Sequence, residues 1–116
     1  MNERPVLSFA MRMIQHPAIE DVALSQVLYA LSDPVRLGVV RQLAQGGEAT
    51  CSALDAGRPK SSMSHHFRVL REAGLVRTRT DGPAHMNELR RDELERRFPG
   101  LLTVVLAAQA EAPGRT

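Results

Sequence analysis

The sequence of 116 residues contains one cysteine, one tyrosine and no tryptophan. With Cys51 alone the chain forms neither an internal disulfide nor a thiolate cluster, which fits a reducing cytoplasm. With so few aromatic residues, the core must be built from Leu, Val, Ala and Met, which favours packed helices over a β-sandwich. The length suffices for one hydrophobic core and not for two. We therefore expect one mostly α-helical domain over residues 1–116.

Long apolar runs are also missing. The N-terminal run Val6–Ile14 is interrupted by Arg12 and is too short to span a bilayer. No small-residue cleavage site follows it. We expect an unprocessed cytoplasmic protein with no membrane partner. Residues 5–15 are predicted to form a short helix that either covers the core or meets a partner, and the sequence leaves both readings open.

Enzymatic signatures are absent too. No nucleophile, base and orienting group occur at motif spacing, no glycine-rich phosphate loop is present, and Cys51 has no obvious histidine partner in the sequence. The sequence therefore predicts a protein that is not an enzyme, with no catalytic residues and no cofactor.

Positive charge is concentrated in one segment. The formal net charge is only +2, yet residues 58–80 hold six basic residues and one acid. A basic segment within an otherwise acidic chain is typical of a nucleic-acid-binding face. An ordinary basic surface is the alternative that charge alone leaves open.

The segment 59–74 is predicted to be an amphipathic helix. At about 100° per residue, Met63, Phe67, Leu70 and Gly74 fall on one side. The opposite side and its flanks carry hydroxyl, imidazole and guanidinium groups, which suit phosphates and base edges. These outward residues are Ser61, Ser62, Ser64, His65, Arg68 and Arg71.

Three helices are predicted before this segment. The first covers residues 18–31, with acids in its first turn. Ser32-Asp33-Pro34 is a strong start signal for the second, over residues 34–45. The third has barely two turns, from Thr50 as its cap to about Ala56. A short helix, a turn containing Gly57 and a second helix with a polar face form a helix-turn-helix over residues 50–74.

A β-hairpin wing is predicted over residues 75–90. Its strands are 75–80 and 84–89, joined by Asp81-Gly82. We expect Met86 and Leu89 to point inward and Pro83 to confine pairing to an edge. Arg77 and Arg79 should project from one side of the first strand, beside the helix, because side chains alternate along a strand.

The C-terminal part, residues 91–110, is predicted to dimerise. Residues 90–97 read as a charged helix with Leu94 and Phe98 inward. Residues 101–108 form a helix that is apolar on nearly every side, which a small domain cannot bury alone but a second subunit could.

With these residues in view, the chain resembles the ArsR-type winged helix-turn-helix transcriptional repressors. Residues 30–37 (ALSDPVRL) are similar to the family's "aLadptRl" opening, and residues 64–76 (SHHFRVLREAGLV) to its "SrHLkvLreaGLV" recognition helix. The resemblance covers about Val27 to Leu94. It implies a homodimer joined by its first and last helices, including the extension 1–17, and bound to a two-fold symmetric DNA operator. The two half-sites of such an operator are expected to lie about 34 Å apart.

The resemblance also implies repression that an effector relieves. Metal-sensing members place two cysteines in a pattern like Glu-Leu-Cys-Val-Cys-Asp-Leu, where this chain has Thr50 and Ser52 with Cys51 between them. One thiol does not make a soft-metal site alone, and residues 101–116 lack the His and Asp of the family's other site. We expect no metal site and an unidentified small-molecule effector. A metal- or redox-responsive repressor is the alternative.

Ten residues are candidate DNA contacts. His65 and Arg68 come first, the three serines permit close approach, and the basic residues suit phosphates. His66 either packs at the core edge or contacts DNA, whereas Arg36 is expected to be structural. The full set is Lys60, Ser61, Ser62, Ser64, His65, His66, Arg68, Arg71, Arg77 and Arg79. The competing function is a protein-interaction module that keeps the winged fold without binding DNA. Salt dependence would separate the two.

Overall fold

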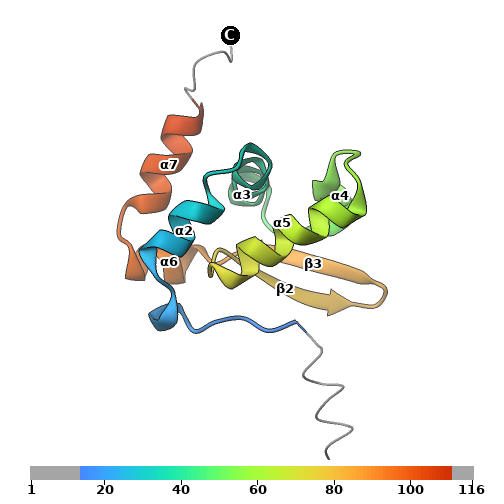
Figure 1. Ribbon diagram of the computed structural model, residues 1–116, viewed down its shortest axis with the longest axis horizontal. Coiled ribbons are helices and arrows are strands. Elements are labelled where there is room, and N and C mark those ends of the chain that lie inside the picture. The colour runs from blue at the N-terminus through green and yellow to red at the C-terminus, as the bar shows by residue number, and fades with distance from the viewer. Residues whose placement is uncertain (1–13, 111–116) are drawn as a thin grey trace, which may run out of the picture.

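The computed structural model describes residues 14–110, so most of the expected helix 5–15 and of the extension 1–17 lies outside the described residues. The elements run in the order η1 (Ile19–Asp21), α2 (Leu24–Ala30), α3 (Pro34–Gly46), β1 (Ala49–Thr50), α4 (Cys51–Asp55), α5 (Lys60–Glu72), β2 (Val76–Asp81), β3 (Ala84–Leu89), α6 (Arg91–Arg97) and α7 (Leu101–Ala110) (Figure 1). The structure is thus a mostly α-helical winged helix-turn-helix, as predicted.

The expected continuous helix over residues 18–31 is wrong. A 3-10 turn, η1, precedes α2, and Val22 and Ala23 between them are extended, with ψ of 126° and 145°. Val22 packs so closely on Gly74 that a Cβ there would lie 2.6 Å from Val22 Cγ2. Arg97 of α6 donates two hydrogen bonds to the Val22 carbonyl, at 3.2 and 2.7 Å. These partners, distant in sequence, stabilise a helix break at Val22 and Ala23 that no neighbouring glycine or proline predicts.

Both predicted helix caps are confirmed. The Asp33 carboxylate accepts hydrogen bonds from the backbone N–H groups of Val35 and Arg36, at 2.8 and 3.1 Å. Burial raises the pKa of Asp33, but these two hydrogen bonds and the nearby charges of His66 and Arg36 together hold the pKa below its usual value. Thr50 Oγ1 accepts from the Ala53 N–H at 3.1 Å and starts α4.

The sheet has three antiparallel strands in the order β1-β3-β2. The expected two-stranded ribbon therefore gains β1, which pairs Ala49 with Asn87 of β3. Pro83 lies in the turn before β3 and does not make β3 an edge strand. Its missing N–H falls outside the ladder, so β3 pairs on both sides.

Met86 is not an inward residue of the wing, contrary to the prediction. Leu89 packs against the core as expected, and since side chains alternate, its face is shared by Asn87 and not by Met86. Asn87 is 0% exposed. Its Oδ1 accepts from Thr78 Oγ1 at 2.6 Å, and its Nδ2 donates to the Ala49 carbonyl and to Cys51 Sγ, both at 3.3 Å. One buried amide thus joins all three strands and α4.

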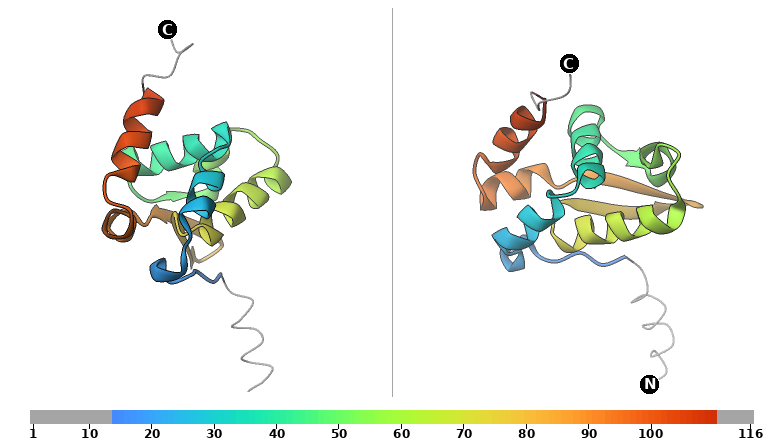
Figure 2. Two further views of the ribbon diagram at one scale, coloured as in Figure 1. Left: turned by 60° about the vertical axis from the view of Figure 1, so that its left-hand side comes forward. Right: turned by 45° about the horizontal axis from the view of Figure 1, so that its top comes forward.

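A single apolar core holds the helices to the sheet. Phe98 packs against it and Leu94 is buried within it, as predicted for α6. In the views of Figures 1 and 2, α2, α6 and α7 gather at the end of the molecule opposite the tip of the β2–β3 hairpin. The tip of the wing is therefore well separated from these three helices.

Candidate nucleic-acid interface

Helix α5 has the buried side and the exposed side that its sequence predicts. Met63, Phe67 and Leu70 are 1%, 4% and 0% exposed. Burying three side chains of this size contributes about 1.5–3 kcal/mol each, which fixes the rotation of the helix about its axis. His65 and Arg68 consequently face solvent.

The exposed side of α5 forms one shallow hollow lined by five of the candidate residues, Ser61, Ser64, His65, Arg68 and Arg71. Arg68 Nη2 lies 3.4 Å from His65 Nδ1. A guanidinium only donates, so in this contact Nδ1 accepts and Nε2 is left to donate. Both side chains therefore offer N–H donors to solvent, the groups that bind phosphate oxygens and the acceptors of guanine.

The remaining α5 candidates have different surroundings. Ser62 is exposed, and its hydroxyl donates to the Pro59 carbonyl at 3.0 Å, at the start of the helix. Lys60 is exposed and makes no ion pair within residues 14–110. Arg71 is half-buried, and burial lowers its pKa, which the nearby Cys51 and Glu72 partly offset.

His66 joins the structural network of Arg36. The Arg36 side chain is buried, donates from Nε to the Ala30 carbonyl at 2.8 Å, and donates from Nη2 to the Tyr29 carbonyl at 3.2 Å. Arg36 Nη1 lies 3.2 Å from His66 Nδ1, which therefore accepts. These contacts lock α5 to the α2–α3 junction. They confirm the structural role expected of Arg36 and favour packing over DNA contact for His66.

The two wing arginines share one face of β2, as expected, but they are not free cations beside α5. Thr78 between them is buried toward the core, so Arg77 and Arg79 point to the outer face. Arg79 pairs with both carboxylate oxygens of Glu48, at 3.0 and 3.1 Å, and this bond raises the pKa of Arg79. Arg77 Nη2 lies 3.3 Å from Glu93 Oε1. Each wing arginine therefore already has an acidic partner.

Sequence reasoning missed the charged residues that brace the wing. Arg90 is buried, donates to Glu93 at 2.7 Å and to the Pro17 carbonyl at 2.9 Å, and its hydrogen bond lowers the pKa of Glu93. His16 Nε2 accepts from the Thr78 backbone N–H at 2.9 Å. Burial, followed by the charges of Arg77, Arg90 and Arg71, lowers the pKa of His16. These partners are far apart in sequence, so no local pattern reveals them.

Groups of ligands suited to a metal are absent from the described residues, where no three His, Cys, Asp or Glu side chains gather. Cys51 is half-buried and is a free thiol. Within the same residues, no helix is long and apolar enough to cross a membrane.

Comparison with known sequences finds DNA-binding regulators. A family model described as a helix-turn-helix domain matches residues 31–79. An "uncharacterized HTH-type transcriptional regulator YceK" of Bacillus subtilis is 37% identical over 86 residues, which cover 72% of this chain and 86% of that protein. The "arsenical resistance operon repressor" of Staphylococcus xylosus is 36% identical over 62% of this chain and 70% of its own length.

Solved structures give the same result. A crystal structure of an ArsR family transcriptional regulator matches with a TM-score of 0.59 and 27% identity, covering 76% of this chain and 92% of that one. A homodimeric winged helix-turn-helix DNA-binding domain of Mycobacterium bovis, described as a possible ArsR-family regulator, matches with a TM-score of 0.60 and 26% identity. That match covers 80% of this chain and 86% of the other.

Proposed function

The chain belongs to the ArsR family of winged helix-turn-helix transcriptional regulators, which bind DNA and are not enzymes, and from that premise we propose that it is a repressor. In this proposal two copies bind one two-fold symmetric operator. The observation that carries it is the orientation of α5, which buries Met63, Phe67 and Leu70 and leaves His65 and Arg68 facing outward.

Each α5 enters a major groove in this proposal. His65, Arg68 and the exposed serines lie at base edges and nearby phosphates, while Lys60 and Arg71 neutralise backbone charge. The wing arginines contact phosphates only after leaving their acidic partners, Glu48 and Glu93. Arg68 is the residue expected to contribute most to sequence preference, because a guanidinium recognises guanine with two hydrogen bonds.

The dimer is built on α2 and α7. Leu24, Leu28 and Tyr29 of α2 are 46%, 47% and 58% exposed, and Val104 of α7 is 66% exposed. Large apolar side chains grouped at one end of a small domain support an interface there. In this proposal a two-fold axis passes through this end, and binding to successive major grooves requires the two α5 helices to lie about one turn of DNA apart. The Mycobacterium bovis domain, described as homodimeric, supports a homodimer.

The effector is an unidentified small molecule and not a cysteine-bound metal. The two positions at which metal-sensing members carry cysteine are Thr50 and Ser52, and Cys51 between them supplies a single thiol. Effector binding weakens operator binding in this proposal.

Selection of bound fragments from random duplex DNA, followed by fluorescence anisotropy on the selected site, tests the function. We expect a symmetric site and affinity that falls steeply with salt, because phosphate contacts release counterions. Arg68→Ala and His65→Ala should weaken binding while the dimer stays intact. Arg96→Ala, which removes an exposed arginine of α6, is the matched control. Unchanged affinity in both α5 variants, or no preference for any duplex, would refute the proposal and favour a protein-interaction module.

A further inference from the structure

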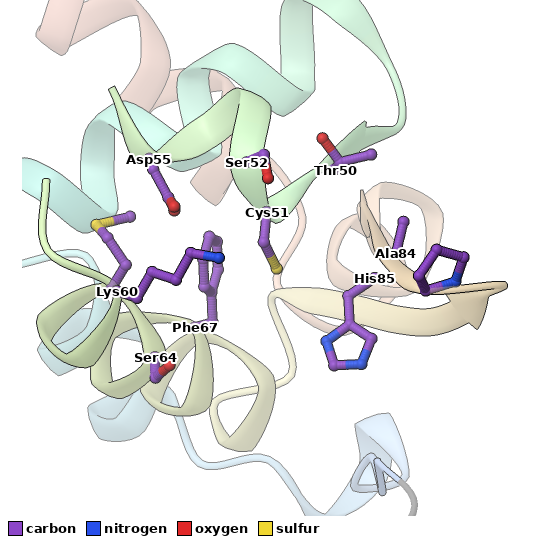
Figure 3. Close-up of a pocket in the computed structure, with 11 residues that line it drawn as sticks. Thr50, Cys51, Ser52, Asp55, Lys60, Ser64, Phe67, Ala84 and His85 are labelled. Atoms are coloured by element: carbon purple, nitrogen blue, oxygen red, sulfur yellow. The ribbon is translucent and has the colours of Figure 1, made fainter. Parts of the chain in front are cut away.

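A cavity of about 240 Å³ lies between α4, the start of α5 and the wing (Figure 3). We call it the helix–wing cavity. Met63 and Phe67 contribute apolar lining. Its polar lining includes Ser52 and Asp55 of α4, Lys60 and Ser64 of α5, and His85 of β3.

The shape of B-DNA suggests what occupies this cavity. A major groove and the neighbouring minor groove are separated by one sugar–phosphate strand. A protein that places α5 in the major groove and its wing beyond the groove edge must therefore have that strand between them. We infer that a backbone phosphate of each half-site sits in the helix–wing cavity, and that His85 is the wing's hydrogen-bond donor to it. This inference rests on the proposed function.

The groups around the cavity suit a phosphate. Lys60 and Ser64 stand on the α5 side, with His85 on the wing side, as Figure 3 shows. None of these three side chains has a hydrogen-bond or ion-pair partner within residues 14–110. An ammonium, a hydroxyl and an imidazole N–H are all donors to phosphate oxygens. The cavity therefore brings free donors to the place where the strand must pass.

The alternation of side chains explains why His85 has this role and the wing arginines do not. His85 shares a face of β3 with Asn87, which points toward α4. Arg77 and Arg79 occupy the outer face, in ion pairs with Glu93 and Glu48. Of the described wing, His85 is thus the side chain that faces the cavity with an unoccupied donor.

Asp55 should oppose phosphate binding in the helix–wing cavity, whereas Lys60, Ser64 and His85 should favour it. Its Oδ1 is shielded from solvent and has no hydrogen-bond partner in the described part of the chain. A carboxylate in the lining repels a phosphate, so Asp55 limits the affinity of the cavity for DNA. Removing this charge should strengthen binding to every duplex, irrespective of sequence.

The test compares His85→Ala, His85→Gln and Asp55→Asn on the selected operator and on a scrambled duplex, at about 0.15 M salt. His85→Ala should weaken binding about tenfold, because it removes a hydrogen bond to a charged group. The loss should be equal on both duplexes, because a phosphate contact carries no sequence information. His85→Gln keeps a donor and should retain most of the affinity. Asp55→Asn should bind both duplexes more tightly. Asp92→Asn, the same neutralisation at an exposed position of α6, at the end of the molecule opposite the hairpin tip, should leave binding to both duplexes unchanged.

Neutral methylphosphonates placed one at a time along the operator backbone locate the contact. At one position in each half-site, the methylphosphonate should weaken DNA binding by the wild-type protein. At that position it should not weaken binding by His85→Ala any further. If His85→Ala binds as the wild type does while Arg68→Ala is weakened, the cavity assignment is wrong and the proposed function stands. If neither substitution changes binding, the proposed function itself fails.

Discussion

Replacing the buried amide of Asn87 should destabilise the fold more than any surface substitution in the wing. Asn87→Ala leaves the Ala49 carbonyl without its side-chain donor, Cys51 Sγ without its donor and Thr78 Oγ1 without its acceptor. Each buried polar group left unsatisfied costs about 1–3 kcal/mol. Some of these groups have other partners, so we expect the free energy of unfolding to fall by about 2–4 kcal/mol. That is a large fraction of the total for a domain of this size.

Urea unfolding followed by far-UV circular dichroism measures this loss, since the chain has no tryptophan to report by fluorescence. All variants must be compared at one protein concentration, because the stability of a dimer depends on it. Thr80→Val, at an exposed position of the neighbouring strand β2, is the control and should stay within about 0.5 kcal/mol of the wild type.

A double-mutant cycle tests the hydrogen bond itself. Thr78→Val and Asn87→Leu replace both partners by apolar groups of similar shape, so the double variant should be more stable than the sum of the single losses predicts, by about 1 kcal/mol. If Asn87→Ala unfolds at the same urea concentration as the wild type, the amide does not join the strands in this way. Strictly additive losses of unfolding free energy in the cycle would show the same.

Four further predictions concern the cap, the N-terminal segment, the wing and the dimer. Asp33→Ala should lower the free energy of unfolding by about 1 kcal/mol at neutral pH; because the pKa of Asp33 lies below 3.8, this difference should vanish as the pH falls through that pKa, as urea titrations at several pH values would show. The pKa of His16 is also lowered, so the unfolded chain binds its proton more readily; the stability contributed by His16 should be full above about pH 6.5 and decrease below it, and His16→Gln should flatten this part of the pH profile. Glu48→Gln should release Arg79 and strengthen operator binding, because Arg79 no longer has to leave an acidic partner to reach a phosphate, and unchanged affinity would exclude Arg79 as a phosphate contact. Leu28→Glu should convert the dimer to a folded monomer, and light scattering that still finds a dimer would remove α2 from the interface.

The parts of the fold that the sequence predicts are those whose partners are close along the chain. The buried side of α5 follows from Met63, Phe67 and Leu70 at helical spacing, and the start of α3 follows from Asp33 directly before Pro34. Each depends on residues within about two helical turns. For the same reason, the sequence predicts the outward face of α5 except at Arg71, which is half-buried.

The parts that the sequence does not predict depend on residues brought together by the fold. The break at Val22 is stabilised by Gly74 and Arg97, and no spacing near Val22 signals it. The face of β3 that packs inward depends on strand register, so the sequence predicts an inward Met86 where the structure has Asn87. Likewise, Arg79 is a candidate DNA contact by charge alone, and only the structure shows that Glu48, 31 residues away, holds it.

The imidazole of His16 also bears on how copies of this protein meet. A strand at the border of a sheet offers a row of backbone groups to which a foreign strand can add, and such addition starts aggregation. Here the N–H of Thr78 on that border is already taken by His16, and the opposite border, β1, is only two residues long. Within the described residues the sheet is thus a poor template for strand addition, which leaves contacts between helices as the route to an ordered assembly.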